Sequence, residues 1–363
     1  MKRLLHALLG LGWLGIFAFP ADAQFTSLYV FGDGVTTTTN GPGGAYYHGN
    51  RFTNGRVWVE VLAERQGLVF DSAKNWSYFG HYSPNLVTNV GNFIAPTDVG
   101  TALFVIWVNN ADFVSHLADS RFAPYNASNL AIWTNAVSGS LSNHLQAIQI
   151  LHAKGARTFV MPNAVDVTKV PYYVGLPNAD KNFLRQRIAD FNAGFAATLA
   201  QARATLSGVA IHIPDVFALF DDAVARPANY GLVNALENGR TVDALSDPAL
   251  EDKSLAGPGA NYIFWDYLDP SARAHAIIAD LAHELVSPVR IRSLTLVNGG
   301  NNQLEVTNLP VGLNGFVDGS TSFAEWPVAA AIQSTTSAKT IQVSVTGPTQ
   351  FYRLRFPHAW TWP

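Results

Sequence analysis

Short apolar runs recur through the first two thirds of the chain, and they constrain its fold more than any other feature. They are Leu28–Phe31, Leu103–Val108, Thr158–Met161 and Val209–Ile213. Runs of this length, rich in β-branched and aromatic residues and without polar alternation, are typical of strands that are covered on both faces. The sequence therefore predicts a sheet with a buried interior.

Segments with helical periodicity separate these strands. Apolar residues at helical spacing run over Val57–Gln66, Asn135–Lys154 and Phe183–Ala204, and a further helix is expected to end near Val286. Glycines follow the first two segments at Gly67 and Gly155, where a residue with positive φ commonly ends a helix. Strands that alternate with helices predict a mostly parallel sheet with helices on both faces, an α/β fold.

Composition narrows the class of protein. The 363 residues are 48% hydrophobic and 13% charged, which is typical of a globular chain. The 23 basic and 26 acidic residues nearly balance, so a nucleic-acid partner is not expected. No cysteine is present, which excludes disulfides, a cysteine nucleophile and a zinc–thiolate site. We expect no cofactor and no metal.

The first 23 residues have the features of a signal peptide. Lys2 and Arg3 precede the apolar run Leu4–Phe19, and small residues around Ala23 form a candidate cleavage site. A membrane anchor is the alternative, but His6 interrupts the run and its length is short for a span. We therefore expect a secreted or periplasmic protein without a membrane span after cleavage.

The last 75 positions, residues 289–363, change in character. Apolar and polar residues alternate over Ile291–Val297, Gln303–Thr307, Thr340–Val345 and Phe351–Phe356, with Asn-Gly and Gly-Gly turns between them. This pattern predicts a small antiparallel β module after a main domain of residues 24–288. About 70 residues make a marginal core, so we expect the module to lean on the main domain.

The tryptophans of the β module suggest that this module could bind a glycan. Trp326, Trp360 and Trp362 are candidates for stacking against a glycan. Core packing is the alternative for Trp326, and the other two lie in the C-terminal tail.

The first strand ends on Phe31-Gly-Asp-Gly34, a tight turn at the edge where open α/β sheets bind ligands. Further along lie Arg51-Phe-Thr-Asn-Gly-Arg-Val-Trp58, Gly155-Ala-Arg-Thr-Phe-Val-Met-Pro-Asn163 and Phe264-Trp-Asp-Tyr-Leu-Asp-Pro-Ser-Ala-Arg-Ala-His275. In this order the motifs resemble blocks of the GDSL (SGNH) esterase and lipase family, over residues 26–287. The resemblance implies a three-layer flavodoxin-like α/β/α hydrolase domain.

The catalytic positions depart from the family pattern. The family block Phe-Gly-Asp-Ser-Leu places its serine nucleophile at Gly34 of this chain. In the last block, Asp266 matches the residue that orients the catalytic histidine, and Asp269 stands in that histidine's own place. His275 matches a family position with a structural role.

The resemblance also assigns the oxyanion donors. Gly80, within Lys74–Tyr82, matches the family glycine, and Ala111 stands where the family has asparagine. Asn109 or Asn110 is a possible substitute amide, although turn residues that tolerate positive φ are the simpler interpretation.

Other residues offer substitute chemistry. Thr36, close to the nucleophile position, and His81, beside Gly80, are candidates for a rebuilt nucleophile and base. Asp33, Asp112, Asp266 and Asp269 are a candidate site for a hard cation such as Ca²⁺ or Mg²⁺.

These observations lead to one hypothesis and two alternatives. The chain is expected to be an exported member of a carboxylester hydrolase lineage, with a pocket for an acyl ester or an acylated sugar. Because serine and histidine are replaced, we expect a pseudoenzyme. An active esterase that uses Thr36 and His81 is the first alternative, and a surface or glycan-binding protein that acts through the β module is the second.

Overall fold

The computed structural model describes residues 25–297, 300–347 and 349–357. The expected signal segment, residues 1–23, and the candidate stacking residues Trp360 and Trp362 lie outside these ranges. Within them, no helix has both the length and the apolar character needed to cross a membrane.

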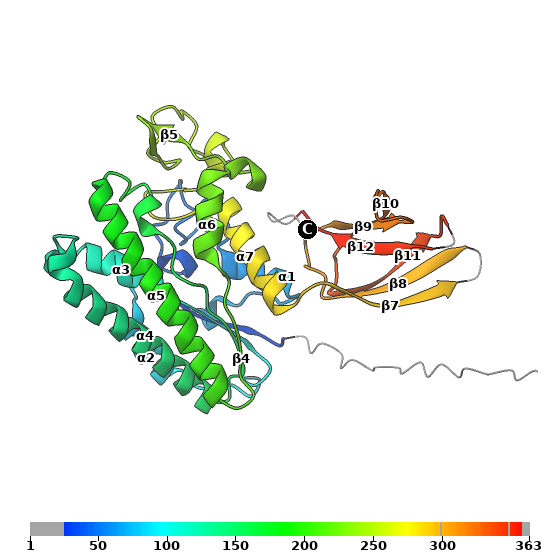
Figure 1. Ribbon diagram of the computed structural model, residues 1–363, viewed down its shortest axis with the longest axis horizontal. Helices are drawn as coiled ribbons and strands as arrows, with labels where there is room; N and C mark the ends of the chain where they lie inside the picture. Colours follow the sequence, from blue (N-terminus) through cyan, green and yellow to red (C-terminus); the bar gives the residue numbers. More distant parts are fainter. Residues whose placement is uncertain (1–24, 298–299, 348, 358–363) are drawn as a thin grey trace, which may run out of the picture.

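The main sheet has four parallel strands in the order β1-β2-β3-β4 (Figure 1). They are β1 (Leu28–Gly32), β2 (Leu103–Trp107), β3 (Thr158–Val160) and β4 (Ala210–His212). A parallel bridge between Val30 and Asn75 places one further segment outside β1. With that segment counted, the order is the 2-1-3-4-5 arrangement of flavodoxin-like sheets. The predicted parallel α/β fold is confirmed.

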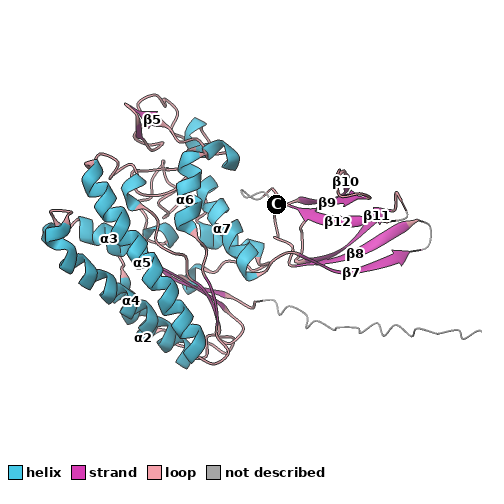
Figure 2. Ribbon diagram, in the orientation of Figure 1, coloured by secondary structure: helices cyan, strands magenta, loops and turns pink. Residues whose placement is uncertain are grey.

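Helices cover both faces of the sheet (Figure 2). On one face α1 (Trp58–Arg65) and α7 (Ala272–Val286) pack against Val30 and Val105 of the sheet. On the other, α2 (Ser83–Asn92), α4 (Leu130–Ala153) and α5 (Asn178–Thr205) pack against the neighbouring strand residues, such as Phe31 and Phe104. Successive strand residues point to opposite faces, which is why two apolar layers form.

Two helices that follow the carboxyl ends of strands β2 and β4 were not expected from the sequence. They are α3 (Asn109–Leu117), which begins directly after β2, and α6 (Val216–Ala225). Asn109 and Asn110 were interpreted as turn residues, but they open α3, and neither has positive φ. Gly67 (φ +71°) and Gly155 (φ +110°) follow helices α1 and α4 as predicted. A two-stranded hairpin, β5 (Leu236–Glu237) with β6 (Arg240–Thr241), lies in the segment before α7.

The C-terminal segment forms two three-stranded antiparallel sheets around a small core of its own. One sheet contains β7 (Arg290–Val297), β8 (Asn301–Thr307) and β11 (Ala338–Ser344), and the other contains β9 (Gly315–Ser320), β10 (Val328–Ile332) and β12 (Phe351–Arg355). The small antiparallel β module is therefore confirmed. Strands β9 and β10 were missed because glycine and alanine, which have low strand propensity, occupy much of them.

The β module rests on α1 and α7 of the main domain. The Arg65 guanidinium donates to the carbonyl of Val311 (3.0 Å), and the Val311 N–H donates to the Arg65 carbonyl (3.2 Å). Arg65 also forms a buried ion pair with Asp280 of α7 (2.7 Å). Trp326 is not part of the module core, because it lies half-buried beneath the Arg353 guanidinium, 4.7 Å from it.

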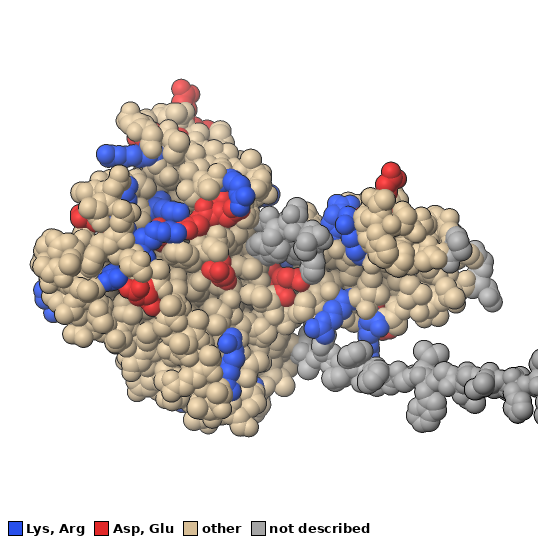
Figure 3. Space-filling model, in the orientation of Figure 1, with Lys and Arg blue, Asp and Glu red and all other residues tan. Residues whose placement is uncertain are grey.

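Charged side chains do not gather by sign on the face shown in Figure 3. Lysine and arginine side chains lie among aspartates and glutamates, between wide areas without charge. The distribution in Figure 3 agrees with the balanced composition of the chain.

Candidate functional site

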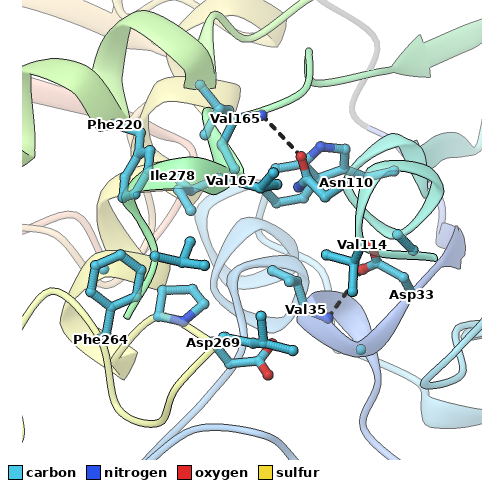
Figure 4. A pocket seen from close by; sticks show the side chains of 18 of the residues that line it. Asp33, Val35, Asn110, Val114, Val165, Val167, Phe220, Phe264, Asp269 and Ile278 are labelled. Atoms are coloured by element: carbon cyan, nitrogen blue, oxygen red, sulfur yellow. Dashed lines mark hydrogen bonds between the residues drawn. The ribbon is translucent and has the colours of Figure 1, made fainter. Parts of the chain in front are cut away.

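A cavity of about 320 Å³ opens among residues that follow the carboxyl ends of the main strands. Its walls are mostly aliphatic and aromatic (Figure 4): Val114, Val165, Val167, Val170, Leu219, Phe220, Phe264 and Ile278. They come from α3, the segment after β3, α6, the loop before α7 and α7 itself, which the parallel topology brings to one edge of the sheet.

This cavity brings together residues that the sequence analysis singled out. Gly34, Gly80, Ala111 and Asp269 all line it, although they are far apart in the chain. Gly34 begins the short 3₁₀ helix Gly34–Thr36 directly after β1, and Ala111 lies in the first turn of α3 directly after β2. Adjacent parallel strands end at the same edge, so these two turns meet there.

Gly34 brings no side chain to the cavity, and two aromatic rings cover its position. A Cβ atom added at Gly34 would lie 3.1 Å from the ring of Phe79 and 3.8 Å from that of Phe52. These two rings stack on each other with centroids 4.9 Å apart. Phe79 is 51% exposed, so its ring has room to move outward.

Asp266 shapes the loop that leads into α7. One carboxylate oxygen accepts from the N–H groups of Leu268 (3.0 Å) and Asp269 (2.9 Å), and the other accepts from the Tyr47 hydroxyl (3.1 Å). Burial raises the pKa of Asp266 to about 6. Asp266 therefore holds the loop through backbone contacts and a tyrosine, and it does not line the cavity.

Asp269 differs from its neighbour because its carboxyl group has no hydrogen-bond partner among the described residues. The side chain is 5% exposed and lines the cavity. Burial raises the pKa of Asp269 well above its ordinary value, and the nearby Asp266 and Asp33 raise it further.

Asp33 is a second buried carboxyl group in the lining. It is 4% exposed, and one of its oxygens accepts from the Val35 N–H (3.1 Å). Burial raises the pKa of Asp33 to about 7, and the Asp112 carboxylate contributes to the rise. In the part of the chain that the structure describes, no lysine, arginine or histidine lines the cavity.

The two candidate asparagines differ in position. The Asn109 amide donates to the Pro162 carbonyl (2.9 Å), and the side chain lies outside the lining. Asn110 lines the cavity; its Oδ1 accepts from the Val165 N–H (2.9 Å), while its Nδ2 donates to no other described residue. Asn110 thus offers an amide N–H₂ group where Ala111 offers none, and Gly80 lines the same cavity with φ +80°.

Thr36 and His81 do not meet. The Thr36 hydroxyl is buried beneath the turn, where it donates to the Asp33 carbonyl (3.0 Å). The His81 ring lies against Tyr78, and its Nδ1 contacts the Asn89 amide (3.2 Å). Neither residue lines the cavity, so this geometry opposes a Thr36–His81 nucleophile and base.

His275 is buried within α7, where its Nδ1 accepts from the Trp58 N–H (3.2 Å). Burial lowers the pKa of His275 to about 3, which keeps the ring neutral. This contact joins α7 to the start of α1, in agreement with the structural role expected for His275.

The four aspartates considered for a cation do not form one set of ligands, although Asp33 and Asp269 both line the cavity and lie near each other. The Asp112 carboxylate accepts from the Ser83 N–H (2.9 Å) and the Ser140 hydroxyl (2.5 Å), and Asp266 is turned toward Tyr47. Over residues 25–297, 300–347 and 349–357, no group of three or more metal-ligating side chains is arranged to hold a metal ion. The arrangement of the described residues therefore does not support a Ca²⁺ or Mg²⁺ site.

Sequence analysis singled out Asn110 and Ala111 but missed the other residues of the same helix face that line the cavity. Asn110, Ala111, Val114, Ser115 and Ala118 all line the cavity. They lie at helical spacing, so recognising α3 as a helix would have predicted a common face. Ser115 brings a serine hydroxyl to the lining, but no lysine or histidine accompanies it among the described residues.

The parallel sheet, its two helical layers and the cavity at the strand ends define a flavodoxin-like α/β protein with a ligand-sized site. The GDSL-like lipase/acylhydrolase family model matches residues 28–282. The chain belongs to this family.

Over the aligned residues, two curated relatives are identical to this chain at little more than a fifth of the positions. The thermolabile hemolysin of Vibrio parahaemolyticus is 23% identical over 237 residues, which are 63% of this chain and 54% of the hemolysin. The chain thus spans about half of that protein. A GDSL esterase/lipase of Arabidopsis thaliana is 22% identical over 73% of this chain and 87% of its own length.

Similarity to solved structures is weaker still. An α/β hydrolase from the metagenome of Lake Arreo, Spain, aligns with a TM-score of 0.38 and 12% identity, over 72% of this chain and 95% of that one. A likeness at this level adds nothing to the argument.

Proposed function

We propose that this protein binds an acyl ester or an acylated sugar in the cavity, without the Ser-His-Asp hydrolysis of its family. The observation that carries the proposal is that Gly34 and Asp269, which replace the serine and the histidine, line the same apolar cavity. The ligand site of the fold is thereby retained while two of its reacting groups are missing.

The missing groups are decisive for the chemistry. Acyl transfer by this route needs a hydroxyl nucleophile and a base that removes its proton. Loss of the serine or the histidine alone costs about a millionfold in a serine protease, and the losses do not add because the residues act as a unit. Oxyanion donors that remain after such a loss still give about a thousandfold over water, which is too little for a useful esterase.

The remaining features favour binding. At about 320 Å³ the cavity is at the lower end of the range for small-molecule sites, about 300–1,000 Å³. Its aliphatic and aromatic walls suit a hydrocarbon chain, and the Nδ2 amide of Asn110 offers a donor for a carbonyl oxygen. Export is part of the same proposal and is supported by the signal features of residues 1–23.

A restored site tests this proposal. The double variant Gly34→Ser, Asp269→His is compared with the native protein and with Gly34→Ser alone, using aryl esters of short and medium chain length. We expect background hydrolysis from the native protein and the single variant, and a gain of at least about tenfold from the double variant. Because a serine Cβ would press on Phe79, the series is repeated with Phe79→Ala. Native hydrolysis well above background would contradict the proposal.

A second candidate function rests on two neighbouring aromatic residues of the β module, one exposed and one half-buried. Phe323 is 57% exposed and lies beside Trp326, whose ring also contacts the Arg353 guanidinium. Aromatic rings can stack on a sugar ring, and the arginine guanidinium can donate hydrogen bonds to its hydroxyl groups. Retention on polysaccharide columns that is lost in Trp326→Ala would favour this function, whereas equal retention of both proteins would oppose it.

A further inference from the structure

An ester-hydrolysing site of this family combines a serine, a histidine and an aspartate, whereas this cavity contains two aspartates and no histidine among the described residues. Its two ionisable side chains, Asp33 and Asp269, are both carboxyl groups, and both are at least 95% buried. None of the described ion pairs involves either residue. An ionised carboxyl group that is buried without a cationic partner is costly, even where a backbone N–H donates to it as the Val35 N–H does to Asp33. Binding of a proton or of a cation removes this cost.

We propose that the cavity selects an aliphatic ligand whose polar end carries an ammonium group, which lies against the carboxyl groups of Asp269 and Asp33. The inference rests on the proposed function of the cavity and narrows its ligand. Fatty-acyl esters of amino alcohols are within this class, and a simple long-chain amine serves as a probe of the ammonium contact alone. Fatty acids are outside it, because they bring a third acidic group and no cation to the pair.

The main support for this inference is the buried carboxyl group of Asp269, which has no donor in the described part of the protein. Its carboxyl oxygens accept no hydrogen bond from the described residues, although the buried side chain lines a mostly apolar cavity (Figure 4). Asp112, which is equally buried, has two donors. A carboxyl group that the fold leaves without a donor is suited to a donor that arrives with the ligand, and an ammonium group brings three.

Two further aspartates lie near the pair, and the phenol groups of Tyr47 and Tyr267 lie near Asp269. Asp33 lies near Asp112 of α3 and near Asp269, while Asp269 also lies near Asp266, which contacts Tyr47. In the free protein these neighbours and burial favour protonated carboxyl groups, with the pKa of Asp33 at about 7. Binding of a cation favours ionised carboxyl groups, so it releases protons.

This linkage gives each probe its own pH dependence. Affinity for octylammonium is expected to increase from about pH 6 to pH 8, because fewer protons must be displaced. Affinity for octanoate is expected to decrease over the same interval. Affinity for methyl octanoate, which carries no charge, is expected to change little.

The test measures binding of octylammonium, octanoate and methyl octanoate by calorimetry to the native protein, Asp269→Asn and the exposed-loop control Glu251→Gln. We expect octylammonium to bind at least about tenfold tighter than octanoate at pH 8, and Asp269→Asn to remove about tenfold of that affinity. Methyl octanoate should bind the native protein, Asp269→Asn and the control alike, which shows that the variant is folded.

The outcomes separate the two proposals. Binding of methyl octanoate without any preference for octylammonium, or an octylammonium affinity unchanged in Asp269→Asn, overturns the ammonium inference alone. Failure of all three probes to bind the native protein overturns the proposed function as well.

Discussion

Two buried carboxyl sites in the main domain show how differently the same side chain is used. Asp112, 3% exposed, accepts from the Ser83 N–H and the Ser140 hydroxyl, and so it joins α3 to α2 and α4. Asp269, 5% exposed, accepts from no described donor and borders a cavity. The fold itself supplies the hydrogen-bond donors of Asp112, whereas the donor that we propose for Asp269 comes from a bound ligand.

The site at Asp112 also contains the residue types of a hydrolase triad. The Ser140 hydroxyl bonds Asp112 and lies 3.5 Å from Nδ1 of His144. His144 is fully buried, burial lowers its pKa, and its ring packs against Phe191 and Phe195. Serine, histidine and aspartate thus meet in the scaffold, whereas the cavity combines two aspartates and a glycine. Residue types do not define a reactive site without access for a substrate.

The largest expected effect concerns Asp33 on the cavity side. Its pKa of about 7 in the folded protein exceeds the ordinary 3.8, so the folded state favours the protonated form. The stabilisation from this group is complete below about pH 4 and is lost as pH rises through 7. At about 1.4 kcal/mol per pKa unit, the loss reaches about 4 kcal/mol.

Urea unfolding between pH 4 and 8 measures this effect as the difference between the native protein and Asp33→Asn. The native protein should lose stability relative to the variant as pH rises. Parallel curves would show that Asp33 ionises as freely in the folded protein as in the unfolded chain.

Asp112→Ala should destabilise the protein by about 3 kcal/mol, because it leaves the Ser83 N–H and the Ser140 hydroxyl buried without an acceptor. Urea unfolding at neutral pH measures the change, and Asp190→Ala on the exposed face of α5 is the control. A loss no greater than that of the control would remove the contrast between the two carboxyl sites.

Asp269→Asn should have the opposite sign and the smallest size, a gain of about 1 kcal/mol at neutral pH. The change keeps the shape of the side chain and removes a group whose ionised form is poorly solvated. The free energy of unfolding is measured on the protein without ligand. A loss of 1 kcal/mol or more would mean that the Asp269 carboxyl group has a structural partner.

Sequence patterns were sufficient for the framework of the domain. The four apolar runs form the four parallel strands, and Gly67 and Gly155 follow helices. Both features were predictable because an apolar run and a helix-ending glycine are visible within a few residues of the sequence. The resemblance of the motifs to the GDSL family also anticipated that Gly34, Gly80, Ala111 and Asp269 line one space.

What the sequence did not reveal depends on contacts between distant segments. Asn110 and Asn109 are adjacent, yet only the helical geometry of α3 turns Asn110 to the cavity and Asn109 to Pro162. Thr36 is close to Gly34 in the chain, but its hydroxyl is turned under the backbone. Whether a polar side chain is satisfied, as Asp112 is, depends on donors far away in sequence.

Turnover of a medium-chain aryl ester by the purified native protein tests the central claim most directly. The measurement uses native protein beside the double variant Gly34→Ser, Asp269→His, with saturating substrate and a burst-phase assay for an acyl-enzyme. The account predicts no burst and background turnover for the native protein, with both appearing in the variant. A burst from the native protein that Ser115→Ala or Thr36→Val abolishes would contradict it.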